Sequence, residues 1–199
     1  MVEAAPPLVL VHGLWDTPRV FNPLIRHLDG RRQPILIPHL PHGIGQVPLE
    51  RLAEQLAAYL TTHVGTEQPI DLLGFSMGGV IARIWLQWLG GHRRTRRFIS
   101  LGSPQQGTLN ALACPPWLLP GIADMGRGSS LLRRLNQDSR ALQQLECVSV
   151  YTPFDLIVTP GWQAALPWGR REELLVWTHD QLLRSPLALE RLGKELLRR

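Results

Sequence analysis

Short apolar runs recur along the chain, and the stretches between them carry apolar residues at the spacing of amphipathic helices. The runs are continuous rather than alternating, as in strands whose two faces are both buried. They predict strands at residues 8–11, 34–37, 70–74, 97–101, 148–151 and 174–177. Because strand and helix patterns alternate, we expect a parallel sheet of about six strands with crossover helices on both faces.

Three helices have recognisable start or stop signals. Pro48 can occupy the first position of a helix whose leucines at positions 52, 56 and 60 share one face. A second helix should run from about Met77 to Leu89, where two glycines end it. The last helix should begin at a serine–proline pair, residues 185–186, and turn the leucines at positions 189, 192 and 196 toward the sheet.

Length and composition are those of an ordinary globular protein. The chain has 199 residues, of which 44% are hydrophobic and 19% charged, so we expect a single domain over residues 1–199. A chain of this length buries enough surface to need no disulfide or metal for stability. The two cysteines, Cys114 and Cys147, are therefore interpreted as reduced thiols.

The chain is basic, with a formal net charge of +5 and a pI near 10.2. Arginines dominate the excess and cluster at residues 31–32, 93–97 and 198–199. Two interpretations stay open: attraction to an anionic membrane surface, or arginines solvated at helix ends. No basic stretch is interleaved with aromatic residues, so no nucleic-acid partner is expected.

A signal peptide begins with a positively charged stretch followed by an apolar one. The first residues of this sequence do not show that pattern. The apolar runs are also far shorter than a membrane span requires. Two interpretations stay open: a cytoplasmic protein, with peripheral contact with a membrane as an option, or a protein from which a leader has been removed.

The strongest chemical signal is the sequence Gly-Phe-Ser-Met-Gly-Gly at residues 74–79. It follows a predicted strand and precedes a predicted helix, so Ser76 should lie on a sharp, strained turn with its hydroxyl exposed at the sheet edge. Gly74 and Gly78 supply the small residues that such a turn needs. Ser76 is the predicted nucleophile.

A loop after the first strand should complete an oxyanion hole. It begins with His12-Gly13-Leu14, and a glycine allows its backbone to approach the nucleophile closely. The backbone amides of Leu14 and Met77 are the predicted donors to the oxyanion. We interpret His12 as a residue that holds this loop rather than as the general base.

A serine nucleophile needs a histidine base and a carboxylate that orients it. Where the serine lies on a turn between a strand and a helix, the acid follows it along the chain and the histidine follows the acid. Asp155 follows the predicted strand 148–151, and His179 follows the predicted strand 174–177. His179 is also the only histidine after Asp155. The competing acids Asp124 and Asp138 precede the strand that should carry the acid.

Together these residues resemble the α/β-hydrolase superfamily, and within it the small lipases and esterases. The resemblance rests on His12-Gly13, on residues 74–79, on the Gly-Ser-Pro at 102–104 with the Gly-Thr at 107–108, and on the positions of Asp155 and His179. It implies a compact α/β-hydrolase fold, and hydrolysis of carboxylic esters with no metal or cofactor. The chain is shorter than larger lipases and has room for only a small lid.

Residues 102–128 are rich in proline and glycine and lack a clear period. The stretch is longer than loops that only connect two elements, so we expect it to form a pocket rim or a short lid. Trp15, Trp117 and Leu118 are predicted to bind substrate, with core packing as the alternative for each tryptophan.

The predicted activity is that of a lipase on acylglycerols or polar membrane glycerolipids. An acyltransferase or a thioesterase with the same triad is the first alternative. A non-catalytic binding protein of the same fold is the second.

Overall fold

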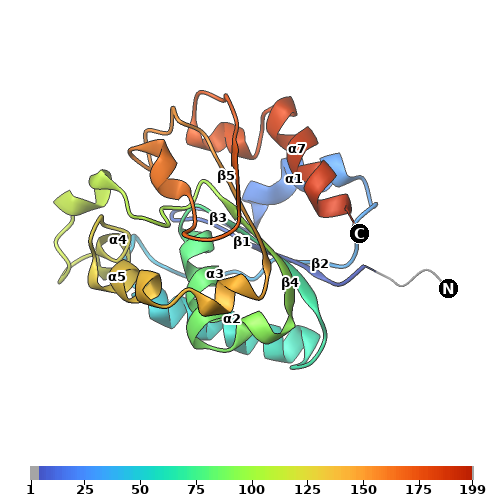
Figure 1. Cartoon of the computed structure of the whole chain (residues 1–199), viewed down its shortest axis with the longest axis horizontal. Coiled ribbons are helices and arrows are strands. Elements are labelled where there is room, and N and C mark those ends of the chain that lie inside the picture. The colour runs from blue at the N-terminus through green and yellow to red at the C-terminus, as the bar shows by residue number, and fades with distance from the viewer. Residues whose placement is uncertain (1–4, 199) are drawn as a thin grey trace.

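A six-stranded, fully parallel sheet forms the centre of the molecule (Figure 1), in a computed structural model that describes residues 5–198. The strand order is β2-β1-β3-β4-β5-β6. The strands are β1 (Leu8–Val11), β2 (Ile35–Leu36), β3 (Ile70–Phe75), β4 (Thr95–Leu101), β5 (Glu146–Tyr151) and β6 (Arg170–Glu173). The open parallel sheet confirms the predicted fold class.

The strand order reverses direction between β1 and β3. The chain passes from β1 outward to the edge strand β2 and then returns to β3, which pairs with the other side of β1. In open α/β sheets, loops at the carboxyl ends of such neighbouring strands enclose the ligand crevice. The loop after β1 and the turn after β3 therefore lie side by side.

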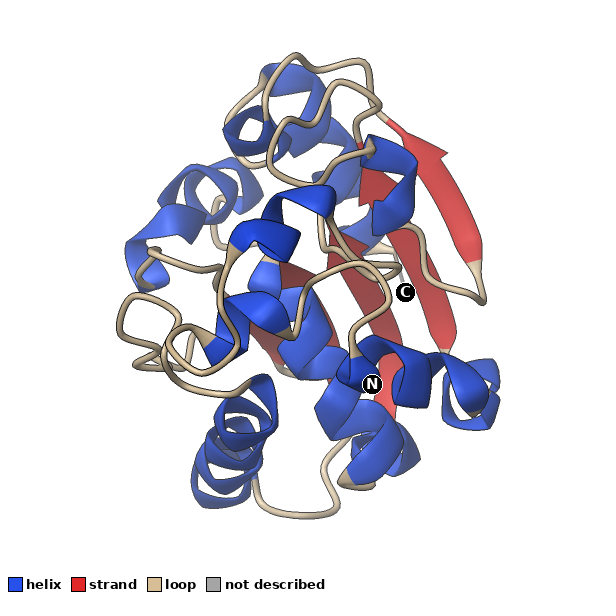
Figure 2. Ribbon diagram, turned by 90° about the vertical axis from the view of Figure 1, so that its left-hand side faces the viewer, coloured by secondary structure: helices blue, strands red, loops and turns tan. Residues whose placement is uncertain are grey.

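Helices cover both faces of the sheet, as Figures 1 and 2 show. Leu8 and Leu10 of β1 point into the apolar cluster under α1 and α7, whereas Val9 and Val11 point into the cluster under α2 and α3. This alternation follows from the two-residue period of a strand. Both faces of β1 are fully buried, which explains its continuous apolar sequence.

The longest helix has 16 residues, and no helix in the described part of the chain is long and apolar enough to cross a membrane. Helix α2 begins at Leu49, one residue after the predicted start, and Ser185 caps α7 as predicted by accepting a hydrogen bond from the amide of Ala188. The α-helices are α1 (Asn22–Leu28), α2 (Leu49–Val64), α3 (Met77–Trp88), α4 (Pro120–Ala123), α5 (Ser130–Gln137), α6 (Arg140–Gln143) and α7 (Pro186–Leu197).

The sixth predicted strand, 174–177, is wrong. The strand that pairs with β5 is Arg170–Glu173. The apolar residues after it add one backbone hydrogen bond to this pairing, from the amide of Leu174 to the carbonyl of Tyr151. The sequence Arg-Arg-Glu-Glu gives no apolar signal because β6 is an edge strand, where charged side chains are common.

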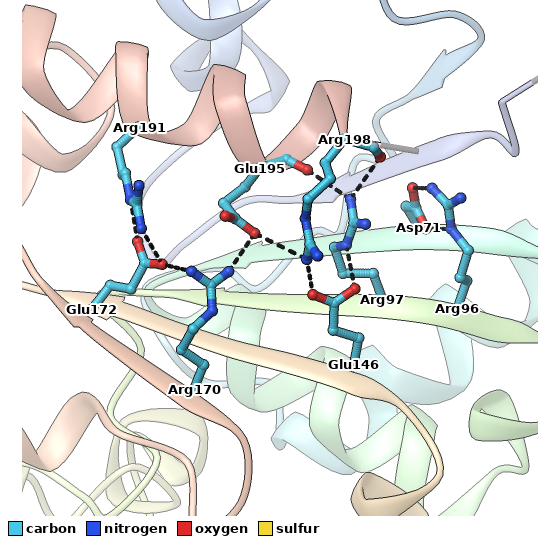
Figure 3. A network of polar contacts seen from close by, with 9 residues as sticks. All are labelled: Asp71, Arg96, Arg97, Glu146, Arg170, Glu172, Arg191, Glu195 and Arg198. Carbon is cyan, nitrogen blue, oxygen red and sulfur yellow. Dashed lines mark hydrogen bonds and ion pairs between the residues drawn. The ribbon is translucent and has the colours of Figure 1, made fainter.

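Beneath α7, the charges of β6 belong to a network that ties the helix to the sheet (Figure 3). Glu172 binds Arg191 of α7, and Arg170 binds both Glu172 and Glu195 of α7. Ion pairs that share partners in this way restrict one another's geometry, unlike isolated surface pairs. The network therefore fixes α7 across the strand that precedes His179.

Several clustered arginines also have structural partners, which corrects the expectation that they are solvated at helix ends. Arg32 is buried and binds Asp71 at 2.8 Å, and Arg96 binds the same carboxylate at 2.6 Å. Arg97 is buried and donates to Glu146 and to the carbonyl of Glu195. Attraction of the basic surface to an anionic membrane stays a prediction.

Residues 102–128 form a 3-10 turn (Leu109–Ala113) and α4, and they fold against the loop after β5. The hydroxyl of Thr108 and the side-chain amide of Asn110 both donate to the carbonyl of Ile157. The segment thus lies next to the loop that carries Asp155.

Candidate active site

Ser76 lies on the turn between β3 and α3 with φ 53° and ψ −127°. A positive φ is strained for a residue with a side chain, and such strain persists only where the surroundings enforce it. Here the amide of Ser76 donates to the carbonyl of Leu101 at the end of β4, and its own carbonyl accepts the amide of Gly79. The turn has the geometry of a nucleophile elbow.

The glycines of the elbow are needed for close backbone contacts. A Cβ on Gly74 would lie 2.4 Å from Cα of Gly79, and one on Gly78 would lie 2.1 Å from the carbonyl oxygen of Val11. The third glycine, Gly79, faces Ser103, whose Oγ would lie 1.9 Å from an added Cβ. Gly78 contacts strand β1 and Gly79 contacts the loop after β4, so the local sequence does not reveal either contact.

His179 and Asp155 lie together, although 24 residues separate them in the sequence. Nδ1 of His179 is 2.7 Å from Oδ2 of Asp155. The second carboxylate oxygen of Asp155 accepts the amides of Ile157 and Val158 at 2.8 and 3.0 Å. Both side chains are buried, so the carboxylate is fixed by its own loop and can orient the imidazole.

The other ring nitrogen of His179, Nε2, is buried and has no hydrogen-bond partner among residues 5–198. The ring packs against Phe75, the residue that precedes Ser76, with ring centroids 4.8 Å apart. It also contacts Gly102, where an added Cβ would lie 3.1 Å from Cε1. The structure thus brings His179 to the elbow with Nε2 unbonded, and the hydrogen bond to Ser76 Oγ is not formed in it.

Opposite the elbow lies the loop after β1. A Cβ on Gly13 would lie 2.9 Å from Cβ of Ser76, so this glycine permits the close approach. Leu14 follows it, and the next residue, Trp15, turns the chain with φ 61°. Met77 is buried at the first position of α3, where helix amides lack intrahelical partners. The two predicted oxyanion donors thus flank Ser76 from separate elements.

The imidazole of His12 is fully buried in this loop and acts as an acceptor, since Nε2 accepts the amide of Leu40 at 3.1 Å. Burial lowers the pKa of His12, and the neighbouring His42 and His39 lower it further. A neutral, buried imidazole bonded to a backbone amide fits the interpretation of His12 as a loop-holding residue.

The competing carboxylates have other partners. Asp124 accepts the amide of Leu49 and so caps the first turn of α2. Asp138 is exposed and binds Arg140, which lowers the pKa of Asp138 to about 2.

The predicted substrate-binding residues are all exposed. Trp15, Trp117 and Leu118 are 70%, 83% and 46% exposed, so core packing does not explain them. None of the three lines the described hollow of about 370 Å³, which is bounded by Trp162, Arg127 and Arg171. The structure therefore does not gather them into one pocket.

A set of exposed apolar side chains flanks the acid and the histidine and was not predicted from the sequence. Phe154 and Trp177 stack with ring centroids 4.7 Å apart, and Leu156, Ile157 and Leu175 are more than half exposed. Their proximity to residues 155 and 179 in the sequence was the available signal.

The family model for the alpha/beta hydrolase fold matches residues 6–190 of the chain. The protein belongs to this family.

Among curated proteins, the human lysosomal thioesterase PPT2 is 29% identical over 118 residues, which is 57% of this chain and 39% of the human protein. A PPT2 homolog of Drosophila melanogaster is 33% identical over 106 residues, 51% of this chain and 36% of that protein. The chain thus matches about two-fifths of the length of these relatives.

Two lipases are among the similar solved structures. Aspergillus fumigatus lipase B superposes with a TM-score of 0.79 at 20% identity, covering 98% of this chain and 53% of that one. The mature Bacillus licheniformis lipase BlEst2 superposes with a TM-score of 0.78 at 16% identity, covering 97% and 92%. At these identities the likeness establishes the fold alone.

Proposed function

We propose that the protein is a serine hydrolase that cleaves carboxylic ester bonds of lipid-like substrates through an acyl-enzyme on Ser76. The observation that carries the proposal is the buried pair of His179 and Asp155, whose imidazole has an unbonded Nε2 and packs against Phe75, the residue before Ser76 on its strained turn. A buried imidazole oriented by a carboxylate and close to a serine hydroxyl is the arrangement that activates a serine.

In this mechanism His179 accepts the proton of Ser76 as Oγ attacks the ester carbonyl, and Asp155 stabilises the imidazolium. The amides of Leu14 and Met77 donate to the oxyanion, each worth roughly 3–4 kcal/mol of transition-state stabilisation. His179 then protonates the leaving alcohol. Water activated by His179 releases the acid and restores Ser76.

Acylglycerols and polar membrane glycerolipids are the proposed substrates. Exposed apolar side chains surround the loops that carry Asp155 and His179, and Trp15 and Trp117 are largely exposed as well. Exposed aromatic and aliphatic residues around a site favour contact with acyl chains or with a lipid surface. We accordingly propose peripheral contact with a membrane as part of the activity.

The decisive experiment is a hydrolysis profile over p-nitrophenyl esters of rising chain length, run beside emulsified triacylglycerol and a polar glycerolipid. Wild type should hydrolyse them, and Ser76→Ala should reduce turnover by up to about a millionfold, because triad members act as a unit. Labelling with a fluorophosphonate should modify wild type and spare Ser76→Ala. Absence of both turnover and adduct would support a non-catalytic binding protein instead.

A thioesterase is the second candidate, because both relatives reported above are named lysosomal thioesterases. An acyl-enzyme on Ser76 forms from a thioester by the same steps. Matched oxygen and sulfur esters of one acyl chain separate the two activities. A kcat/KM far higher for the sulfur ester would favour the thioesterase.

A further inference from the structure

A carboxylate that the proposed triad does not use lies beside the nucleophile. A Cβ on Gly13 would lie 2.8 Å from Oδ2 of Asp16 and 2.9 Å from Cβ of Ser76. The carboxylate and the nucleophile therefore flank the same backbone position. Asp16 is partly buried, in the loop that contributes Leu14, one of the two proposed oxyanion donors.

Within residues 5–198 no arginine or lysine forms an ion pair with Asp16. The titratable groups that face it are His179, Asp180 and His42. Burial raises the pKa of Asp16, and the Asp180 carboxylate raises it further, while His179 and the amide of Gly13 oppose them. An unpaired carboxylate beside a nucleophile is costly to keep, which points to a use for its charge.

We propose that Asp16 is a specificity-determining residue, which favours ester leaving groups that carry a positive charge or a hydroxyl group over those that carry a negative charge. The inference rests on the proposed function. His179 is the group that protonates the leaving oxygen, so the leaving group must lie on the side of the site that Asp16 faces. A carboxylate there attracts a cation, accepts a hydrogen bond from a hydroxyl and repels an anion.

Three butyrate esters with leaving alcohols of similar size test the proposal: butyrylcholine, 3,3-dimethylbutyl butyrate and the butyrate ester of 2-hydroxyethanesulfonate. At low ionic strength, wild type should show kcat/KM falling in that order. Asp16→Asn should reduce the ratio of kcat/KM for the cationic ester to kcat/KM for the anionic ester by about tenfold or more. This is the effect of one charge a few ångströms away in a partly solvated site. Raising the salt to about 1 M should narrow the ratio in wild type and leave Asp16→Asn nearly unaffected.

Asp29→Asn is the matched control, because it removes one negative charge at the end of α1, away from the elbow. Its φ of 47° lies in the left-handed region that asparagine also adopts, so the exchange is not strained. This variant should keep the wild-type ratio. Asp16→Glu retains the charge and should restore most of the preference, which a purely structural role of Asp16 would not produce.

The pH dependence of the same ratio isolates Asp16. Any loss of triad activity affects all three esters alike and cancels in the ratio of their kcat/KM values. As pH falls through the raised pKa of Asp16, its carboxyl becomes neutral, so the wild-type preference should fade on acidification.

An unchanged ratio in Asp16→Asn, with the esters still hydrolysed and circular dichroism unaltered, would overturn the assignment of Asp16 while leaving the proposed function intact. An equal narrowing in Asp29→Asn would also overturn it. Should the esters resist hydrolysis while Ser76 still reacts, the rates of Ser76 modification by a cationic and a neutral phosphonate give the same comparison. Failure of Ser76 to react at all overturns the proposed function, and this inference with it.

Discussion

Oδ2 of Asp155 lies 2.7 Å from Nδ1 of His179, while the opposite oxygen of the same carboxylate accepts two backbone amides of its own loop. One oxygen of the carboxylate is thus held by its own loop, and the other faces Nδ1 of the imidazole. The loop after β5 fixes the orientation of a histidine that comes from the loop after β6.

This relationship predicts the effect of Asp155→Asn. The amide side chain has the same shape, so the fold should persist, but it fails to hold His179 in the tautomer that leaves Nε2 free to accept a proton. Turnover of a p-nitrophenyl ester should fall by up to about 10⁴-fold, with circular dichroism unchanged.

Asp124→Asn is the control for that variant. Its side chain caps α2 through the amide of Leu49, and an asparagine caps nearly as well, so turnover and stability should both change little. If Asp124→Asn abolished turnover and Asp155→Asn did not, the acid would be misassigned.

Gly78→Ala should destabilise the protein and impair turnover together. The added Cβ would lie 2.1 Å from the carbonyl oxygen of Val11, so either β1 or the elbow must move. Overpacking against backbone costs about 1–3 kcal/mol or more of unfolding free energy, measurable by urea denaturation. Gly193→Ala in α7 is the comparison, because its nearest neighbour is the tip of the His27 side chain, which can rotate away. A harmless Gly78→Ala would show that the contact is not needed.

Arg83 of α3 is predicted to be structural. Its buried guanidinium donates to the side chains of Gln87 and Asn136 and to the carbonyls of Gln105 and Leu135, and burial lowers its pKa to about 10, which leaves it charged at neutral pH.

Arg83→Met leaves these acceptors unsatisfied, so we expect a loss of about 2–4 kcal/mol in urea unfolding. The exposed Arg51, replaced in the same way, should change the free energy of unfolding much less. Equal losses for the two variants would contradict the structural role of Arg83.

The two cysteines should differ in reactivity. Both are unpaired in the structure. Cys147 is 3% exposed, and burial raises its pKa to about 12, so almost none of it is thiolate at pH 8. Cys114 is partly exposed. A thiol reagent such as DTNB should titrate one thiol in the native protein and two in denaturant; two fast-reacting native thiols would contradict the burial of Cys147.

The elbow illustrates what local sequence encodes. A buried strand, a serine between glycines and a helix start are adjacent in the chain, and each follows from short-range sterics and periodicity, so Ser76 was placed on its turn from the sequence alone. Five of the six strands were found in the same way from their apolar runs. Burial on both faces explains the runs of the inner strands, whereas the edge strand β2 is only half-buried.

The sixth strand shows where that reasoning fails. The chain at 170–173 carries only charges, and it becomes a strand because β5 offers it a free edge and α7 offers it ion partners. Both conditions depend on segments distant in the chain, and no local pattern reveals them.

The sequence alone determined the order of nucleophile, acid and base and the elements that carry them, because chain order and periodicity are local properties. Only the tertiary structure decided that Asp155 is bonded to His179, that Nε2 is left free near the elbow, and that the carboxylate of Asp16 lies beside Ser76. These relationships depend on distances across neighbouring strands, which are set by how the sheet pairs and how its helices pack.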